Sequence, residues 1–368
     1  ATRRSDVTDT PLRWLLMASH VPPGGALGGM VRYTVELARA LVARPDVELS
    51  VLCAAEAVDY WAAEVGDVRR AYPLARVPVP AQGWLERQGR GSEAFRQNFD
   101  VIQGTKHLLP RRTTATTVLT VHDLLPLDRP GDFGRLKRAL LPGPYLASAA
   151  EADVLVCISA ATRDRLLSYV PQVADRTSVI PLANESAGLG AAEPRAIAEL
   201  RNKPFALVVG DSSPRKNLPL VVNAWPEVRR RIPDARLAVV GPPSWGESHL
   251  GSGHLDPGVQ ILGRIDDDQL RWAYAHAHVV LCPSLLEGFG LPSVEGLRAG
   301  TPVITSEDPA LCEASGAAAR HVSSLEPRHW VDAIVDALAE RGTVTRPVTR
   351  TWQQVADETV RAVRHVAG

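Results

Sequence analysis

The chain has 368 residues, and at about 150 residues per domain this length predicts two domains. Lys plus Arg and Asp plus Glu each number 41, so the net charge is zero and the broad positive field of a nucleic-acid-binding protein is missing. Hydrophobic residues make up 45% and charged residues 22%, which excludes disordered and fibrous chains.

The cysteines and the apolar runs point to the cellular compartment. The four cysteines, Cys53, Cys157, Cys282 and Cys312, form no metal-ligand or C-x-x-C pair, so we expect small core side chains in a reducing environment. No stretch approaches the ~20 apolar residues of a membrane span, and the polar N-terminus does not resemble a signal peptide. We therefore expect a soluble, cytoplasmic protein.

Short runs rich in Val, Leu and Ile alternate with helical patterns along nearly the whole chain. Continuous apolar runs suit strands that are buried on both faces, as in parallel sheets. In chain order the expected strands are 13–18, 48–53, 118–121, 154–158 and 178–180, followed by 205–209, 236–240, 259–262, 279–282 and 303–305. This alternation predicts an α/β fold with two Rossmann-like, doubly wound parallel-sheet domains that face each other across a cleft.

The strand pattern stops around residues 185–204, where Ala, Gly and Glu accumulate, and it restarts at Phe205. We interpret this stretch as a hinge between an N-terminal domain, 1–184, and a C-terminal domain, 205–350. The tail, 351–368, predicts one more helix, which we expect to return to the N-terminal domain.

Two features of the first half follow expected strands. The segment 22–29, PPGGALGG, lacks the spacing of a G-x-G-x-x-G fingerprint, so a nicotinamide cofactor is not indicated. Gly28 and Gly29 let backbone N–H groups approach an anion, or they form only a flexible turn. His122 follows the strand 118–121, so it is expected at the carboxyl edge of the sheet, although a structural histidine fits as well.

The second half opens with a basic loop. After the strand 205–209 the chain runs through Gly-Asp-Ser-Ser-Pro to Arg215 and Lys216, and a helical pattern follows. A guanidinium and an ammonium at a strand-to-helix loop suit a diphosphate, while two solvated surface charges are the plain alternative. The chain has only four lysines, which favours a function for Lys216.

The strongest motif is PSLLEGFGLPSVE at 283–295. Glu287 precedes a Gly-Phe-Gly turn, and Pro292 suits the first turn of a helix that carries Glu295. Free N–H groups at a helix start suit a phosphate, and carboxylates accept hydrogen bonds from sugar hydroxyls. Helix-capping acids would explain either glutamate alone, but they explain the whole cluster poorly.

This segment, extended to PSLLEGFGLPSVEGLRAGTPVI, resembles the hallmark of retaining GT-B glycosyltransferases of family 4. Three other motifs stand in the order that is typical of this family: the N-terminal Gly-Gly loop, PRKNL after a strand, and LGRIDDDQL. The resemblance spans essentially the whole chain. VHDLLPL with PRKNL is similar to the mannosyltransferase-rich part of the family. The resemblance implies an acceptor-side N-terminal domain and a C-terminal domain that binds a nucleotide sugar.

The resemblance also implies a role for each matching residue. The catalytic set is His122, near the reacting sugar, Lys216, on the leaving diphosphate, and Glu287, on the transferred sugar. The donor-binding set consists of Gly28, Gly29, Arg215, Lys216, Gly263, Arg264, Glu287, Phe289, Gly290, Leu291 and Glu295, with Glu295 on the ribose. One departure is Asp211, which stands where many members of the family have an arginine.

We therefore expect a retaining hexosyltransferase without a cofactor or metal. The first choice of donor is GDP-mannose and the second is UDP-glucose or a related UDP-hexose; the acceptor is a glycan, a lipid-linked saccharide or a small molecule. Asp266, Asp267 and Asp268 imitate a metal-binding pair but precede a helix, so we interpret them as its N-cap region.

Two alternatives to a transferase stay open at this point. A contact with a membrane surface also stays open. A non-catalytic nucleotide-sugar-binding GT-B protein would lack one of the reacting residues. The other alternative is a nucleotide-sugar epimerase or a phosphorylase on a related fold, and such a phosphorylase would need a lysine for pyridoxal phosphate, for which four lysines offer few candidates. The partners expected are the donor and acceptor, with no nucleic acid. Residues 135–141 join three basic residues to three leucines, which predicts either a solvated amphipathic helix or a weak membrane-surface contact.

Overall fold

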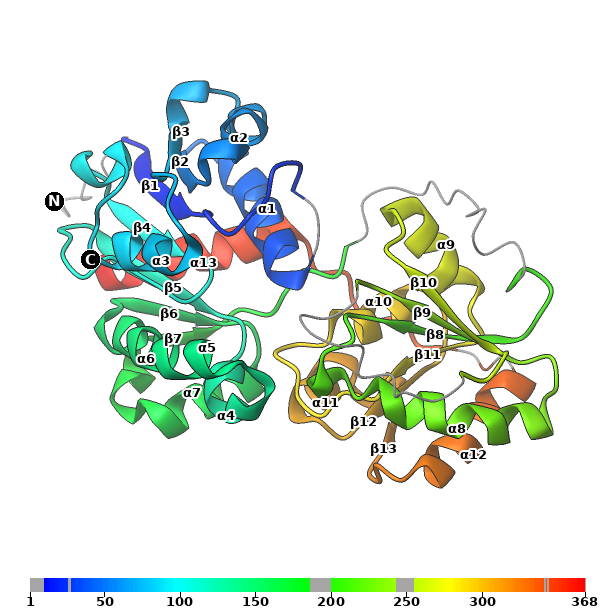
Figure 1. The fold of residues 1–368 in the computed structure, drawn as a ribbon. Coiled ribbons are helices and arrows are strands. Elements are labelled where there is room, and N and C mark those ends of the chain that lie inside the picture. The colour runs from blue at the N-terminus through cyan, green and yellow to red at the C-terminus, as the bar shows by residue number, and fades with distance from the viewer. Residues whose placement is uncertain are drawn as a thin grey trace, which may run out of the picture. The chain divides into compact units, whose positions relative to one another are not determined.

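The computed structural model describes residues 10–25, 28–185, 200–242, 255–340, 342 and 344–367. The chain divides into two compact units (Figure 1): unit 1 comprises Ala1–Ala183 and Arg350–Gly368, and unit 2 comprises Asn184–Thr349. The predicted hinge, 185–204, lies mostly outside the described residues. The helix expected in 351–368 belongs to unit 1.

Unit 1 is built on a parallel sheet of seven strands in the order β3-β2-β1-β4-β5-β6-β7. Its strands are β1 (Leu12–Met17), β2 (Val47–Cys53), β3 (Ala71–Pro73), β4 (Val101–Gly104), β5 (Thr116–Val121), β6 (Val154–Cys157) and β7 (Thr177–Val179). The strand order reverses between β1 and β4, where Trp14 pairs with Val101 and Met17 pairs with Gly104.

The helices of unit 1 lie between these strands, and the last one comes from the end of the chain. They are α1 (Gly29–Val42), α2 (Val58–Val65), α3 (Val79–Arg87), α4 (Leu125–Asp128), α5 (Arg135–Leu140), α6 (Pro142–Glu151), α7 (Ala160–Tyr169) and α13 (Trp352–Ala367). Helix α13 packs on α1, β5 and β6, with Val355, Ala356 and Val360 buried.

Unit 2 repeats the design with a parallel sheet of six strands in the order β10-β9-β8-β11-β12-β13. Its strands are β8 (Phe205–Val209), β9 (Arg236–Val240), β10 (Val259–Gly263), β11 (Val279–Cys282), β12 (Val303–Ser306) and β13 (Arg320–Val322). Its helices are α8 (Leu218–Arg231), α9 (Asp267–His276), α10 (Leu291–Ala299), α11 (Pro309–Ser315) and α12 (Pro327–Ala339).

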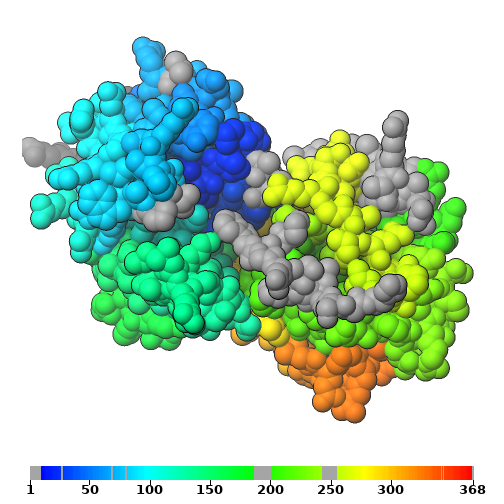
Figure 2. All heavy atoms as spheres, viewed as in Figure 1, coloured from blue at the N-terminus to red at the C-terminus, as the bar shows by residue number. Residues whose placement is uncertain are grey.

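Helices cover both faces of the unit 2 sheet. On one face, Trp225 of α8 and Trp330 of α12 are fully buried in one hydrophobic cluster. On the other, Trp272 of α9, Leu297 of α10 and Leu311 of α11 form a second cluster, and α9 (yellow) lies at the surface of the unit in Figure 2. Strands packed on both faces confirm the predicted α/β class of two doubly wound parallel sheets.

Three strands were missed because their sequences do not show a strand pattern. β3 and β13 are three residues long, and β4 has only two apolar residues, Val101 and Ile102. Their pairing partners make them strands, since β4 lies between β1 and β5 in the middle of the sheet. The other predicted strands match the observed ones to within two residues at either end.

Local signals also set the ends of two helices in unit 2. Asp266 caps α9 in a reciprocal arrangement with Gln269, which confirms the predicted N-cap role of this acidic run. Helix α10 has Pro292 in its first turn and ends at Gly300, whose φ is +81°. None of the described helices is long and apolar enough to span a bilayer.

Candidate active site

Two loops of unit 2 leave neighbouring strands at the point where the strand order reverses. β8 and β11 lie side by side, and α8 and α10 follow the loops at their carboxyl ends. In doubly wound sheets this reversal opens a crevice in which ligands bind. The loop after β8 carries Arg215 and Lys216, and the loop after β11 carries Glu287.

The loop after β8 turns Lys216 back over the end of the strand. Pro214–Lys216 form a single 3-10 turn, and Asn217 adopts a left-handed conformation with φ of +50° before α8 begins. A Cβ on Gly210 would lie 3.2 Å from Cε of Lys216. Glycine at this strand end therefore gives the lysine stem room to pass.

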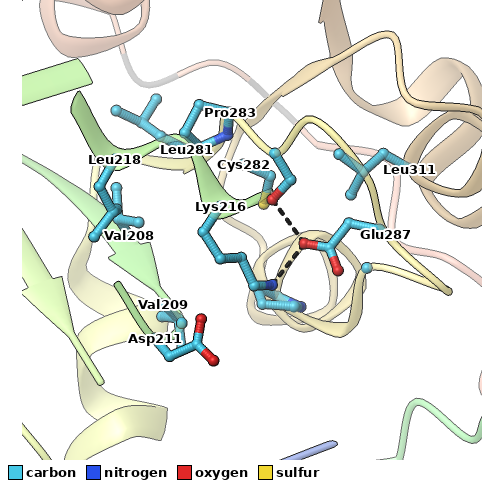
Figure 3. Close-up of a pocket in the computed structure, with 14 residues that line it drawn as sticks. Val208, Val209, Asp211, Lys216, Leu218, Leu281, Cys282, Pro283, Glu287 and Leu311 are labelled. Carbon is cyan, nitrogen blue, oxygen red and sulfur yellow. Dashed lines mark hydrogen bonds and ion pairs between the residues drawn. The ribbon is translucent and has the colours of Figure 1, made fainter. Parts of the chain in front are cut away.

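Three side chains donate hydrogen bonds to the carboxylate of Glu287. Its Oε1 accepts hydrogen bonds from Lys216 Nζ at 2.6 Å and from Ser284 Oγ at 2.6 Å, and its Oε2 accepts one from Arg215 Nη1 at 2.9 Å. The residue is only 6% exposed. Figure 3 shows Lys216 reaching toward Glu287, whereas the carboxylate of Asp211 lies apart from the pair and accepts hydrogen bonds from Ser213.

Backbone bonds join the two loops into one support. The N–H of Leu285 donates to the carbonyl of Arg215 at 2.7 Å, and Ser306 Oγ donates to the carbonyl of Ser284 at 2.5 Å. The Arg215–Lys216 turn and the Glu287 loop are thus fixed to each other and to β12. Such support holds charged groups in place before a ligand binds.

Opposing effects set the protonation of Glu287. Burial raises the pKa of its carboxyl, but the charges of Lys216 and Arg215 and the hydrogen bonds from Lys216 and Ser284 outweigh burial and lower the pKa to about 2. Glu287 is therefore a carboxylate at neutral pH. Two cations facing one carboxylate leave this trio with one excess positive charge, which suits an anionic ligand.

The pocket at this site is small because the charged side chains occupy it. Its free space is about 10 Å³, roughly what one water molecule needs. The lining residues are Val208, Val209, Gly210, Asp211, Lys216, Leu218, Leu281, Cys282, Pro283, Ser284, Glu287, Gly290, Pro292 and Leu311. A polar floor between apolar walls strengthens electrostatic contacts with any group that enters.

The start of α10 completes the region. Gly290 has φ of +95°, and a Cβ there would lie 2.4 Å from Cδ2 of Leu311, so no other residue fits this turn without a shift. Phe289 is 8% exposed. One turn into the helix, Glu295 accepts a hydrogen bond from Tyr274 Oη of α9 at 2.8 Å. Glu295 is half-buried, so it is accessible from the surface.

Glycines lie at the carboxyl ends of β8 and of the two strands on its other side, β9 and β10. A Cβ on Gly241, after β9, would lie 1.9 Å from the carbonyl oxygen of Gly210. The N–H of Gly241 donates to the carbonyl of Gly263, which ends β10 with φ of +64° and precedes Arg264. Gly241 was not predicted as a site residue, although a glycine directly after a buried strand was the available signal.

The remaining predicted residues lie in unit 1. Gly28 is the N-cap of α1, with φ of +108°, and Gly29 is the first residue of that helix. His122 is 6% exposed, and its Nε2 lies 3.1 Å from the carbonyl oxygen of Thr105. Burial is the main cause that lowers the pKa of His122 to about 4, against the attraction of Asp123, so its imidazole is neutral at pH 7.

Three further residues lie near His122 at the carboxyl ends of β1 and β4. Burial and the charge of Lys106 lower the pKa of His20 to about 3, and burial lowers that of His107 to about 4. Both histidines also interact electrostatically with His122. Lys106 and His107 follow β4, a strand with no strand pattern in its sequence, so they were not predicted as site residues. His20 lies two residues after the predicted strand 13–18.

Comparison with known families covers both units. Residues 27–183 match the family described as Glycosyltransferase Family 4, and residues 203–340 match the family described as Glycosyl transferases group 1. Together the two matches take in His122 and the whole Arg215–Lys216–Glu287 site. The chain belongs to the family 4 glycosyltransferases.

Relatives agree with this assignment. This glycosyltransferase is 28% identical over 318 residues to the O-antigen chain mannosyltransferase B of Escherichia coli, covering 79% of this chain and 81% of the relative. It is 27% identical over 286 residues to the serotype-specific mannosyltransferase WbdA of E. coli, covering 69% of this chain but 35% of WbdA. The chain thus spans about a third of that second relative.

The fold has close counterparts among solved structures. Sucrose-phosphate synthase from Thermosynechococcus elongatus superposes with a TM-score of 0.67 at 19% identity, covering 96% of this chain and 94% of that one. The two parallel-sheet α/β units and their similarity to solved GT-B structures confirm the predicted GT-B fold. In this glycosyltransferase the predicted donor residues of the C-terminal half gather at the carboxyl edge of one sheet, and their individual roles are proposals.

Proposed function

We propose that this glycosyltransferase transfers a hexose from a nucleotide sugar with retention of anomeric configuration. The observation that carries the proposal is the trio of Arg215, Lys216 and Glu287 at the strand reversal of unit 2, beside the start of α10. An anion held there meets an ammonium, a guanidinium and the N-terminal end of a helix dipole. A diphosphate is the anion that GDP-, UDP- and ADP-linked sugar donors share.

We propose GDP-mannose as the first choice of donor and UDP-glucose or a related UDP-hexose as the second. Mannosyltransferases among the relatives support this order. We assign the ribose to Glu295, which Tyr274 holds in place, and the base to the backbone near Gly263 and Arg264. Gly28, Gly29, Phe289, Gly290 and Leu291 make up the rest of the proposed donor contacts.

The bond changes follow from the charges. As the bond from the anomeric carbon to the phosphate oxygen breaks, its electron pair goes to the diphosphate, where Lys216 and Arg215 stabilise the growing negative charge. The acceptor oxygen bonds to the same face of the anomeric carbon and gives its proton to the departing phosphate oxygen. Glu287 positions the sugar hydroxyls, and His122, neutral and buried, accepts a hydrogen bond from the sugar.

This mechanism makes no use of a carboxylate nucleophile or a metal ion. Both oxygens of Glu287 are hydrogen-bonded to Lys216, Ser284 and Arg215, which disfavours nucleophilic attack by this residue. We expect Glu287→Gln to retain measurable turnover and mass spectrometry of donor-treated enzyme to show no glycosyl adduct. Turnover should survive excess EDTA, since the two cations neutralise the diphosphate; loss of activity restored by Mg²⁺ would contradict this.

The acceptor proposed for unit 1 is a glycan, a lipid-linked saccharide or a small molecule. Helix α5 displays Leu136 and Leu140, 64% and 53% exposed, among the exposed cations Arg135, Lys137 and Arg138; this part of unit 1 lies at the surface in Figure 2. We propose weak contact with an anionic membrane surface through this helix. Co-sedimentation with anionic vesicles, lost on Leu136→Ser, tests it. The cytoplasmic location stays a prediction.

One experiment tests the whole proposal. The protein is incubated with GDP-mannose, UDP-glucose and ADP-glucose in separate reactions, and released nucleoside diphosphate is measured with and without mannose-containing acceptors. We expect GDP release that depends on Lys216, and an axial product linkage at the anomeric carbon by NMR. Tight donor binding without release from any donor would instead establish a non-catalytic nucleotide-sugar-binding protein, and an inverted anomer would refute retention.

A further inference from the structure

A chain of buried polar side chains crosses the sheet of unit 1 and ends on a tyrosine. Trp14 Nε1 donates to Gln103 Oε1 at 3.2 Å, and Gln103 Nε2 donates to Thr120 Oγ1 at 3.1 Å. Thr120 Oγ1 lies 3.2 Å from the hydroxyl of Tyr33 in α1. All four residues are at most 1% exposed, so the position of the Tyr33 ring is fixed from its hydroxyl end.

The ring of Tyr33 contacts two other rings. It meets the imidazole of His122 edge to face, with centroids 4.8 Å apart and planes at 85°. It also contacts the indole of Trp352, with centroids 5.9 Å apart and planes at 67°. Trp352, Tyr33 and His122 thus form a contiguous row of edge-to-face ring contacts, called the ring stack below, in which Tyr33 is the central member.

Within the described part of unit 1, one hydrogen bond also restrains the imidazole of His122. The carbonyl oxygen of Thr105 lies 3.1 Å from His122 Nε2, and the hydroxyl of Thr105 donates to the carbonyl of Met17 at 2.8 Å. A carbonyl can only accept, so Nε2 carries the proton and Nδ1 is the atom with the lone pair. A half-turn of the ring would exchange Nδ1 for a carbon, and the imidazole torsion has no strong preference of its own.

Trp352 reaches the stack from the far end of the sequence. It is the first residue of α13, and Thr351 and Gln354 cap that helix reciprocally. Just before it, Arg350 donates to the carbonyl of Pro181 at 2.8 Å and forms a bidentate pair with Glu358. The indole is 6% exposed. These contacts therefore hold the start of α13 in the position where the Trp352 indole contacts the Tyr33 ring.

We propose that Tyr33 and Trp352 are positioning residues that hold the imidazole of His122 in the orientation required for glycosyl transfer. The relevance to transfer rests on the role proposed above for His122. The physical reason is that the ring stack blocks rotation of an imidazole that has a single hydrogen-bond anchor. Neither residue touches the substrate; each acts through His122.

The test compares variants that remove a ring with variants that keep one. Tyr33→Leu and Trp352→Leu remove the ring contacts, whereas Tyr33→Phe and Trp352→Phe keep an aromatic ring in place. Tyr72→Leu is the matched control, because Tyr72 makes a similar edge-to-face contact with Phe99 at 6.2 Å and 88° on the outer strand of the same sheet. Thermal unfolding and far-UV circular dichroism report the folded fraction of each variant.

Two measurements are made on the full chain. The first is kcat and KM for release of GDP from GDP-mannose, corrected for folded fraction. The second is the ¹³Cε1 resonance of His122 and its titration, assigned by its absence in His122→Asn. The titratable groups that interact with His122, namely Asp123, His20 and His107, are unchanged in these variants.

We expect both leucine variants to lower kcat on the order of tenfold, with KM for the donor within twofold, because a displaced catalytic group slows chemistry without touching donor binding. The His122 resonance should shift, and its pKa should rise from about 4 toward the ordinary value as water gains access. The phenylalanine variants should stay within threefold of the parent kcat. Tyr72→Leu should change thermal stability alone.

Unchanged kcat per folded molecule in both leucine variants would overturn the proposal, and so would an unchanged His122 resonance. If both leucine variants fail to fold, Tyr33→Phe decides: it loses the hydroxyl contact with Thr120, so the His122 resonance should shift in the same direction by less, and no shift would overturn the proposal. The NMR measurement needs no turnover. A parent protein that releases no diphosphate would therefore refute the proposed function, while the state of the His122 resonance would still decide the positioning role.

Discussion

Replacing Lys216 by methionine separates the structural from the catalytic role of its ammonium. Lys216→Met keeps most of the side-chain stem that passes over Gly210, but it removes the charge that lies 2.6 Å from Oε1 of Glu287. Glu287 stays buried and keeps its hydrogen bonds from Arg215 and Ser284. The variant thus leaves a buried carboxylate with half of its cationic support.

The pKa of Glu287 gives the scale of the effect on stability. Burial raises the pKa of Glu287 and its partners lower it, and the net change from the ordinary 4.5 to about 2 stabilises the folded carboxylate by about 3 kcal/mol. This contribution is complete above about pH 4.5 and is lost as the pH falls through 2, because the unfolded chain takes up the proton first. Lys216 is the largest attractive cause, so its loss should cost about 2 kcal/mol at pH 7.

Lys216→Met should also lower turnover, and by more than its loss of unfolding free energy would suggest. A charge that acts mainly as the diphosphate departs contributes to kcat, and we expect a loss on the order of 100-fold or more, or about 2.7 kcal/mol in the barrier. The matched variant is Lys216→Met with Glu287→Gln. It contains no unsupported carboxylate, so its unfolding free energy should recover to within about 1 kcal/mol of the parent, while its turnover should not recover.

The assays are urea unfolding at pH 7 and initial rates of diphosphate release at saturating donor. Turnover of Lys216→Met within a few-fold of the parent would show that the ammonium does not stabilise the leaving group. Equal stability of Lys216→Met and the parent would refute the argument that Lys216 supports a buried charge.

Three further outcomes follow from single contacts. Glu295→Ala should raise KM for the donor about tenfold with kcat within threefold, and Tyr274→Phe, which removes only the supporting hydrogen bond, should have a smaller effect in the same direction; a kcat defect alone would contradict the ribose assignment. Gly290→Ala should lower the unfolding free energy by about 2 kcal/mol or more in urea titrations, since its Cβ would meet a leucine methyl at positive φ, whereas Gly131→Ala, in open space, should stay within about 0.5 kcal/mol. His122 has a lowered pKa, so the unfolded chain binds its proton first and stability should fall from pH 6.5 to 5; His122→Asn should remove about 2 kcal/mol of that fall, and identical pH profiles would refute its burial as a neutral group.

The sequence by itself was enough to place the motifs on the fold. Long apolar runs such as 205–209 and 279–282 must be buried on both faces, so they predict parallel strands with the following loops at one edge. Because parallel strands all end at the same edge, Lys216 and Glu287 could be expected near each other without knowledge of the strand order. Glycine and proline at 290, 292 and 300 likewise determined the limits of α10, since they act through local backbone geometry.

Only the tertiary structure decided which partners these side chains have. β4 is a strand because its neighbours pair with it. No local sequence pattern therefore predicted Lys106 and His107 at the end of a strand. That Glu287 binds both cations depends on β8 and β11 being adjacent, which pairs residues more than seventy positions apart. Trp352 reaches Tyr33 only because α13 packs on α1. Such contacts depend on distances in the folded chain, whereas a sequence pattern reports periodicity and local conformation.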